Sequence, residues 1–213
     1  MFRRLASWVR LKFLVIGFVR RNLECRYLAW VANRHQDYVE LLMSCVAHEF
    51  NEASDADFEY EWHTQPLPGY TLNRSGTRTS EICWEAPVCY TVHLAQKPLV
   101  GMAVEFRGKT LCIRQLQGQS GAQIPKNLQR WPALFLSGAK NFLNNTEEFT
   151  TLRLYAADQR ISYRIPASKL SEEEMRRYQQ NLRRRYDGTA RQEGFKKVNT
   201  KYWEWNLSMH KKN

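Results

Sequence analysis

One segment of this chain constrains its fold more than any other: an apolar run, 110–116, that passes through a glycine-containing turn into a helical pattern. The turn contains Gly118 and Gly121, and apolar residues then recur at spacings of three and four as far as Leu143. A strand, a glycine turn and a helix in this order are typical of α/β proteins. Free amide groups at such a turn, together with the positive end of the helix dipole, favour an anion. The segment therefore predicts either an anion site or an ordinary structural turn.

The segments around this turn predict one mixed sheet. Short runs rich in Val, Ile, Thr and Tyr, separated by breaks that contain proline or glycine, occur before it: 80–84, 88–95, 99–107 and 109–116. Such runs predict an antiparallel meander. After the helical segment come a strand at 150–155, a helix opened by the capping box of Ser171 and Glu174, and a strand at 201–207. This order predicts an α/β (α+β) fold in which helices flank a mixed sheet.

The N-terminal part of the chain predicts helices rather than strands. Residues 1–21 combine a basic start with an apolar stretch at 13–19, which is too short to span a bilayer. The first helix is predicted to be amphipathic, so it either packs on the domain core or lies on an anionic membrane surface. We expect a basic helical segment at 1–53 and an α/β domain at 54–213.

The charge of the chain predicts attraction to polyanions. The formal net charge is +11, so nucleic acid, an anionic membrane surface and phosphorylated small molecules are candidate partners. The candidate contacts are arginines near both ends of the chain: Arg10, Arg20, Arg21, Arg183, Arg184 and Arg185. Tyr178 and Tyr186 lie among the later ones, as in many nucleic-acid-binding proteins. The alternative is a solvated helix face that pairs with the acidic residues 172–174.

The cysteines and histidines predict a reduced protein without a metal. The 5 cysteines are an odd number and form no CxxC motif, so we expect free thiols and a cytoplasmic protein. A peripheral position at the inner face of the membrane is the alternative location. The 5 histidines show no metal-ligand spacing, so no metal site is expected.

The order of elements and the turn together resemble the GNAT superfamily of N-acyltransferases, in which this loop takes the pyrophosphate of acyl-CoA. The family's loop motif is Gln/Arg-x-x-Gly-x-Gly/Ala, and Gln115-Leu-Gln-Gly118-Gln-Ser120 is similar to it except for the final Ser. Many members carry a Tyr four residues before a late Gly-Phe pair. Here the pair is Gly194-Phe195, and Ala190 stands at the Tyr position. The resemblance implies acyl-CoA or CoA as cofactor and these binding residues: Arg114, Gln117, Gly118, Gln119, Ser120, Gly121 and Ala122, with Arg130 as an alternative source of charge.

A narrower resemblance is to the VirK/YbjX family of bacterial proteins, a domain without an established activity. Leu116-Gln117-Gly118 is similar to that family's strand ending, and Tyr163-Arg164 to its Tyr-Arg pair. Tyr186-Asp187, with Gly194 eight residues after the Tyr, is similar to its Tyr-Asp…Gly-Gly ending. The resemblance covers roughly residues 80–207, and the family's Thr-Lys and Arg-Pro-Lys elements are missing.

The acyltransferase resemblance also implies catalytic residues. A strand carboxylate can act as general base toward an amine, which makes Glu105 the candidate; its alternative role is an ion pair with an arginine. Tyr163 or Tyr186 can protonate the thiolate leaving group, and Asp187 can orient the donor or accept a proton. The alternative for the adjacent pair is a core anchor at Tyr186 and a helix end at Asp187.

Two functional hypotheses follow from these patterns. The first is an acyl-CoA-dependent N-acyltransferase with an unknown amine acceptor. The second is a non-enzymatic basic protein that keeps the fold and associates with anionic membrane or nucleic acid.

Overall fold

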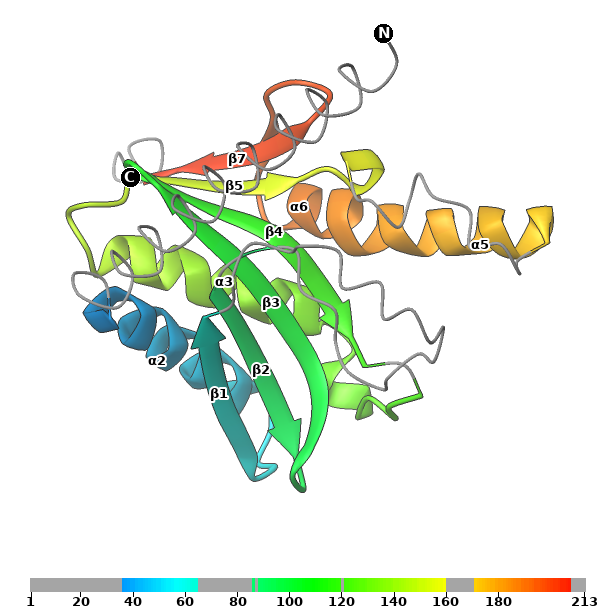
Figure 1. Cartoon of the computed structure of the whole chain (residues 1–213), viewed down its shortest axis with the longest axis horizontal. Helices are drawn as coiled ribbons and strands as arrows, with labels where there is room; N and C mark the ends of the chain where they lie inside the picture. The colour runs from blue at the N-terminus through cyan, green and yellow to red at the C-terminus, as the bar shows by residue number, and fades with distance from the viewer. Residues whose placement is uncertain (1–35, 65–85, 87, 120, 160–170, 208–213) are drawn as a thin grey trace, which may run out of the picture.

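The fold is a seven-stranded mixed sheet with helices packed against it, as the sequence predicted (Figure 1). The computed structural model describes residues 36–64, 86, 88–119, 121–159 and 171–207. The strands are β1 (Phe58–Thr64), β2 (Val88–Leu94), β3 (Lys97–Arg107), β4 (Thr110–Gly118), β5 (Thr151–Tyr155), β6 (Lys196–Lys197) and β7 (Tyr202–Asn206). The helices are α2 (Gln36–Ala53), η1 (Lys126–Leu128), α3 (Trp131–Asn144), η2 (Ala157–Gln159), α5 (Glu172–Arg183), η3 (Arg184–Gly188) and α6 (Thr189–Gln192).

The first four strands form the predicted antiparallel meander, and the sheet order is β1-β2-β3-β4-β5-β7-β6. Gly108, at φ +53°, makes the expected β3–β4 turn. The β2–β3 turn was placed wrongly by sequence: it lies at Ala95 and Gln96, both with positive φ, and Pro98 falls inside β3. Pro98 is tolerated there because it lies beside a shift in the β2–β3 register. The predicted strand at 80–84 lies outside the described residues.

Strand β4 leaves its neighbour β5 partway along its length. The two strands pair in parallel from Thr110 to Ile113, whereas β4 continues to Gly118. The separation coincides with a β-bulge: Val104 faces Ile113 and Ala103 faces Gln115, so Arg114 is an extra residue in β4. A bulge bends its strand and increases the local twist, which turns the end of β4 away from β5.

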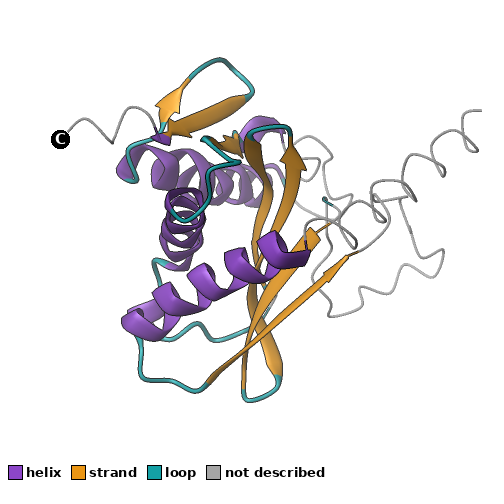
Figure 2. Cartoon of the chain, turned by 90° about the vertical axis from the view of Figure 1, so that its left-hand side faces the viewer, coloured by secondary structure: helices purple, strands orange, loops and turns teal. Residues whose placement is uncertain are grey.

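Helices α2 and α3 lie side by side against the sheet (Figure 2). Their contact is close enough that a Cβ atom on Gly138 would lie 2.8 Å from the Cα of Val46. Phe50 of α2 meets Phe135 of α3 edge to face, and both are fully buried in the same core as the strands. Residues 36–53 therefore share the hydrophobic core of the sheet. The division of the chain at residue 53 stays a prediction, since 1–35 lie outside the described residues.

The long helix after the glycine turn begins later than the sequence indicated. Pro125 precedes only the short helix η1, and α3 starts at Trp131. Pro132 then occupies the first turn of α3, where its missing N–H has no intrahelical partner to lose. The glycine turn therefore does not lead directly into the helix.

The C-terminal helix is interrupted rather than continuous. The capping box predicted for α5 is present, with reciprocal hydrogen bonds between Ser171 and Glu174. After Arg183 the helix widens into one π-helical turn, η3, and continues as α6 until Gly194 (φ +77°). Figure 1 shows α5 extending to one side beyond the strands, and Leu182 is its buried residue. The π-helical turn packs against the sheet instead, through Tyr186.

Candidate functional site

The glycine turn after β4 uses part of its backbone for internal hydrogen bonds. The Gln119 amide donates to the Leu99 carbonyl at 2.9 Å, and the Ala122 amide donates to the Gln119 carbonyl at 3.2 Å. Gly121 has φ +80°, so glycine relieves strain at this turn position. The side chain of Gln117 accepts a hydrogen bond from that of Gln115. Two of the amides predicted to hold an anion are thus engaged, and Ser120 lies outside the described residues.

The turn nevertheless lies against the beginning of α3. A Cβ atom on Gly118 would lie 3.8 Å from the ring of Trp131, the first residue of the helix. Helix η1 lies between the turn and α3 in the sequence, but the turn and the start of α3 are still neighbours in the fold. The predicted neighbourhood of turn and helix N-terminus therefore exists, although the two are not consecutive in sequence.

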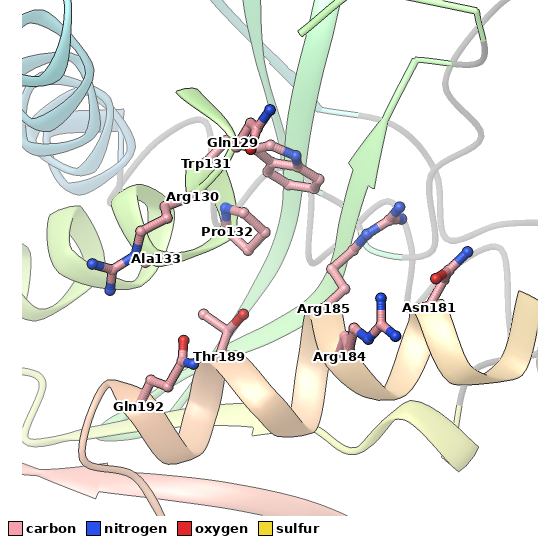
Figure 3. Close-up of a pocket in the computed structure, with 10 residues that line it drawn as sticks. All are labelled: Gln129, Arg130, Trp131, Pro132, Ala133, Asn181, Arg184, Arg185, Thr189 and Gln192. Atoms are coloured by element: carbon pink, nitrogen blue, oxygen red, sulfur yellow. The ribbon is translucent and has the colours of Figure 1, made fainter. Parts of the chain in front are cut away.

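A pocket of about 340 Å³ opens between the start of α3 and the C-terminal helix. Its lining residues are Gln129, Arg130, Trp131, Pro132, Ala133, Asn181, Arg184, Arg185, Thr189 and Gln192 (Figure 3). This set contains arginines, side-chain amides and a hydroxyl, and it contains no carboxylate. Such a lining suits an anionic ligand, because every guanidinium is a permanent cation with several donors.

The backbone of α3 adds to the positive potential of this pocket. No side-chain hydrogen bond caps the helix at Arg130, and its first turn carries no acidic residue. Pro132 has no N–H, and the Ala133 and Leu134 amides donate to the Arg130 carbonyl at 2.8 and 3.4 Å, so it is the helix dipole that favours negative charge beside the pocket.

An acidic residue lies at one edge of the pocket, but a lysine balances it. Glu193 pairs with Lys140 at 3.0 Å and with Arg130 at 3.4 Å. Lys140 also donates to the Glu193 carbonyl at 2.7 Å, and both side chains are 18% exposed, whereas Arg130 is 73% exposed. The tighter, less exposed contact is the one with Lys140. Because Arg130 makes only the longer and more exposed contact, its guanidinium can still bind an anionic ligand.

The π-helical turn η3 holds two arginines at the pocket wall. The guanidinium of Arg185 lies over the Trp131 ring, 5.4 Å from its centroid, in a cation–π contact. Its neighbour Arg184 is exposed and lines the same pocket. Arg183, the third arginine of the predicted polyanion surface, is exposed at the end of α5 and does not line the pocket.

Tyr186 and Asp187 do not act on a common atom. The buried Tyr186 hydroxyl donates to the Leu116 carbonyl at 3.0 Å and accepts from the Leu116 amide at 2.8 Å. Asp187 accepts from the Trp203 indole at 2.8 Å and from the Ala157 amide at 3.4 Å. Both contacts join the C-terminal helix to the sheet side of the molecule. Catalytic roles for these two residues stay predictions.

The remaining predicted site residues are distributed over other parts of the molecule. Glu105 pairs with Arg107 at 2.8 Å, which is the alternative that the sequence left open. Arg114 lies on the sheet with its guanidinium 4.2 Å from the centroid of the Tyr155 ring, and it does not line the pocket. Of the two arginines considered as partners of the turn, Arg130 is the one beside α3. Tyr163 lies outside the described residues, and so do the N-terminal arginines Arg10, Arg20 and Arg21.

The sequence interpretation missed that Arg184 and Arg185 lie opposite the start of α3. Their signal in the sequence was a charged run, which by itself indicates only an exposed helix face. The π-helical turn that directs them has no sequence signature that spacing could reveal. Asn181 and Thr189, which also line the pocket, gave no signal of their own.

Three further features of the described residues concern metals, membranes and thiols. No cluster of His, Cys, Asp and Glu in that part of the chain could hold a metal ion. None of its helices has the length and apolarity needed to cross a membrane. Three of the cysteines, Cys45, Cys89 and Cys112, are buried and free. Burial raises the pKa of the Cys112 thiol to about 11.

The strand order, the parallel β4–β5 step through α3 and the flanking helices define a mixed α/β fold. No protein-family model and no curated protein matches the chain, so the narrower VirK/YbjX resemblance gains no support. Among solved structures, the chain is similar to YhhK of E. coli, a candidate N-acetyltransferase whose structure contains coenzyme A. That match has 12% identity and a TM-score of 0.32, covering 70% of this chain and 98% of YhhK.

A second match is a tandem GNAT protein of the clavulanic acid biosynthesis pathway, solved without acetyl-CoA. Its identity is 12% and its TM-score 0.31, with 66% of this chain and 45% of that chain covered. Because both TM-scores are low, the fold assignment rests on the strand order and register described above.

Proposed function

We propose that the chain is an acyl-CoA-dependent N-acyltransferase-like protein with an unidentified amine acceptor. The observation that carries the proposal is the arginine-lined pocket without a carboxylate, next to the glycine turn after β4. Acyl-CoA is an acyl donor with a strongly anionic nucleotide end, so its phosphates match this part of the surface.

The residues that would hold CoA come from two sides. The turn at 117–122 would contribute backbone amides that are not used internally, with Gly118 and Gly121 allowing close approach. Arg130, at the start of α3, would add charge from the other side. Bound acyl-CoA supplies a thioester, whose acyl group passes to an amine with loss of the thiol.

The catalytic groups of this reaction would come from residues outside the pocket. Tyr163 or Tyr186 would donate a proton to the departing sulfur, and Glu105 or a water would accept one from the amine. The Tyr186 hydroxyl is hydrogen-bonded to the backbone of Leu116, and Glu105 forms an ion pair with Arg107, so each group would first have to break these contacts. Of the two tyrosines, Tyr163 is therefore the one to test first.

Thermal unfolding with and without CoA, acetyl-CoA and palmitoyl-CoA tests the proposal. A ligand at a hundred times its dissociation constant adds about 2.7 kcal/mol to the free energy of unfolding, so a binding species raises Tm visibly. Gly121→Trp is expected to abolish the rise, because a bulky side chain would fill the turn. Gly108→Trp is the matched control, since Gly108 also has positive φ and open space around it.

Absence of a Tm rise with every CoA species would reject the proposal. An equal loss of the rise in the Gly121 and Gly108 variants would remove the turn from the site. Either result would direct attention to the second candidate function.

The second candidate is a non-enzymatic binding protein that keeps the GNAT-like fold. It is favoured by one observation: the described catalytic candidates Glu105, Tyr186 and Asp187 all have structural partners. Anionic membrane or nucleic acid would then meet Arg10, Arg20 and Arg21 together with Arg183, Arg184 and Arg185. This function predicts a steep loss of binding with salt, measured with anionic vesicles and with single-stranded nucleic acid. Salt-independent binding would reject it. A cytoplasmic location is part of both proposals.

A further inference from the structure

The pocket between α3 and the C-terminal helix has two cationic ends. Figure 3 shows Asn181, Arg184 and Arg185 together at one end, and Arg130 at the other, beyond Pro132. The glycine turn reaches the pocket at Trp131, whose ring lies 3.8 Å from where a Cβ atom of Gly118 would be and has its centroid 5.4 Å from the guanidinium of Arg185. A ligand with two separate anionic groups would therefore find donors for both.

The end formed by Asn181, Arg184 and Arg185 is suited to a phosphate monoester. Arg184 takes part in none of the ion pairs found among the described residues. The lining contains no carboxylate that a doubly charged phosphate would have to approach. Guanidinium groups bind phosphate oxygens in pairs, and an amide side chain adds a further donor.

The chain also anchors the backbone that carries these two arginines. They are the first two residues of the π-helical turn η3, and the third residue, Tyr186, is anchored to Leu116 by both hydrogen bonds of its hydroxyl. The turn is thereby tied to β4, next to the end that carries the glycine turn. π-helical turns occur frequently at functional sites, because they redirect side chains that a regular helix would point elsewhere.

We propose that the Asn181–Arg184–Arg185 end of the pocket binds the 3′-phosphate of coenzyme A and so selects CoA over dephospho-CoA. This inference rests on the proposed function, which places the pyrophosphate at the glycine turn and Arg130. The pocket volume of about 340 Å³ lies within the range of small-ligand sites. The adenosine end of CoA carries both groups, a pyrophosphate at one position of its ribose and a phosphate monoester at another.

Isothermal titration of the full chain with CoA, dephospho-CoA, adenosine 3′,5′-bisphosphate and inorganic phosphate tests this inference. We expect CoA to bind at least about tenfold more tightly than dephospho-CoA, the size of one charge-assisted contact. Arg184→Gln should remove most of that difference while leaving the affinity for dephospho-CoA unchanged. Arg176→Gln is the matched control, because it removes an exposed arginine of α5 that does not line the pocket.

The outcomes separate this inference from the proposed function. Equal affinities for CoA and dephospho-CoA would overturn the inference and leave the proposed function standing. Binding of the bisphosphate that depends on Arg184, without binding of CoA, would reject the acyltransferase proposal and overturn the selection of CoA inferred here. Inorganic phosphate that competes as well as the bisphosphate would show a site for free phosphate and overturn the inference. If none of the probes binds, both proposals are wrong.

Discussion

The Tyr186 hydroxyl binds both backbone groups of one residue of β4: it donates to the carbonyl of Leu116 and accepts from its amide. Leu116 lies past the last residue of β4 that pairs with β5, so its groups on that side have no strand partner in β5. The tyrosine takes the place of a neighbouring strand there. An unpaired amide and carbonyl would otherwise be buried at this point, at a high free-energy cost.

Removing that hydroxyl is expected to destabilise the fold. Tyr186→Phe leaves both groups of Leu116 without a partner in a buried site, and should lower the free energy of unfolding by about 1–3 kcal/mol. Urea unfolding measures the change, with an unchanged m-value if the native state stays compact. Tyr178→Phe, at an exposed position of α5, is the control and should have little effect. Equal stabilities of the two variants would contradict the structural role of the hydroxyl.

The close contact between α2 and α3 predicts a second sensitive position. Gly138→Ala places a Cβ atom 2.8 Å from the backbone of Val46, so the helices must move apart. We expect a loss of about 1–3 kcal/mol, as for other overpacked cores, measured by thermal or urea unfolding. Gly188→Ala is the matched control, since its Cβ atom would meet its nearest neighbour at an ordinary 3.8 Å. A stable Gly138 variant would mean that α2 packs less closely than described.

Buried thiols and phenols predict a loss of stability at alkaline pH. Burial raises the pKa of Cys112 from 9.0 to about 11, and that of Tyr60 from 10.0 to about 12. Each group ionises more easily in the unfolded chain than in the folded one. The contribution of the neutral group to the free energy of unfolding is therefore complete below its pKa in the unfolded chain. That contribution is lost as the pH rises through its pKa in the folded chain.

Unfolding measured between pH 8 and pH 11 checks this dependence, with Cys112→Ala as the comparison. For one fully buried thiol the slope is on the order of 1.4 kcal/mol per pH unit between the two pKa values. The variant should lose stability less steeply above pH 9. Parallel curves for the two proteins would show that Cys112 ionises as easily in the folded chain as in the unfolded one.

The acidic residue at the pocket edge predicts a variant with tighter anion binding. Glu193→Gln removes the carboxylate that attracts Arg130, so that guanidinium becomes fully available to a phosphate group. We expect the affinity for adenosine 3′,5′-bisphosphate to rise several-fold, roughly 1 kcal/mol. Glu173→Gln, whose partner Arg177 is exposed on α5 away from the pocket, controls for net charge. The same rise in both variants would indicate only a general electrostatic effect.

Much of the fold could be predicted because its signals are local. The capping box of Ser171 and Glu174, the hairpin at Gly108 and the short runs rich in β-branched residues that form the meander each depend on a few adjacent residues. Two errors have physical reasons. The β2–β3 turn uses Ala95 and Gln96 in the left-handed region, where Gly, Asn and Asp are more usual. Helix η1 delays the start of α3 to Trp131, which no propensity signal marked.

The site was harder to predict than the fold, because it depends on long-range contacts. The glycine turn was visible as a motif, but its neighbour Trp131 and the arginines across the pocket come together only through tertiary packing. Tyr186 was noticed as a chemical group, whereas its bond to Leu116 joins residues 70 positions apart. Spacing along the chain carries no information about such a pair.

The two walls of the arginine pocket come from segments that are widely separated in the chain, 129–133 and 181–192. The pocket therefore exists only while the C-terminal helix is docked on the sheet, and any ligand bound there stabilises the docked state over a locally opened one. A ligand in the pocket should therefore increase the protection of the C-terminal third against amide hydrogen exchange. A protein emptied of ligand should exchange its amide hydrogens faster in η3 and α6 than in the central strands.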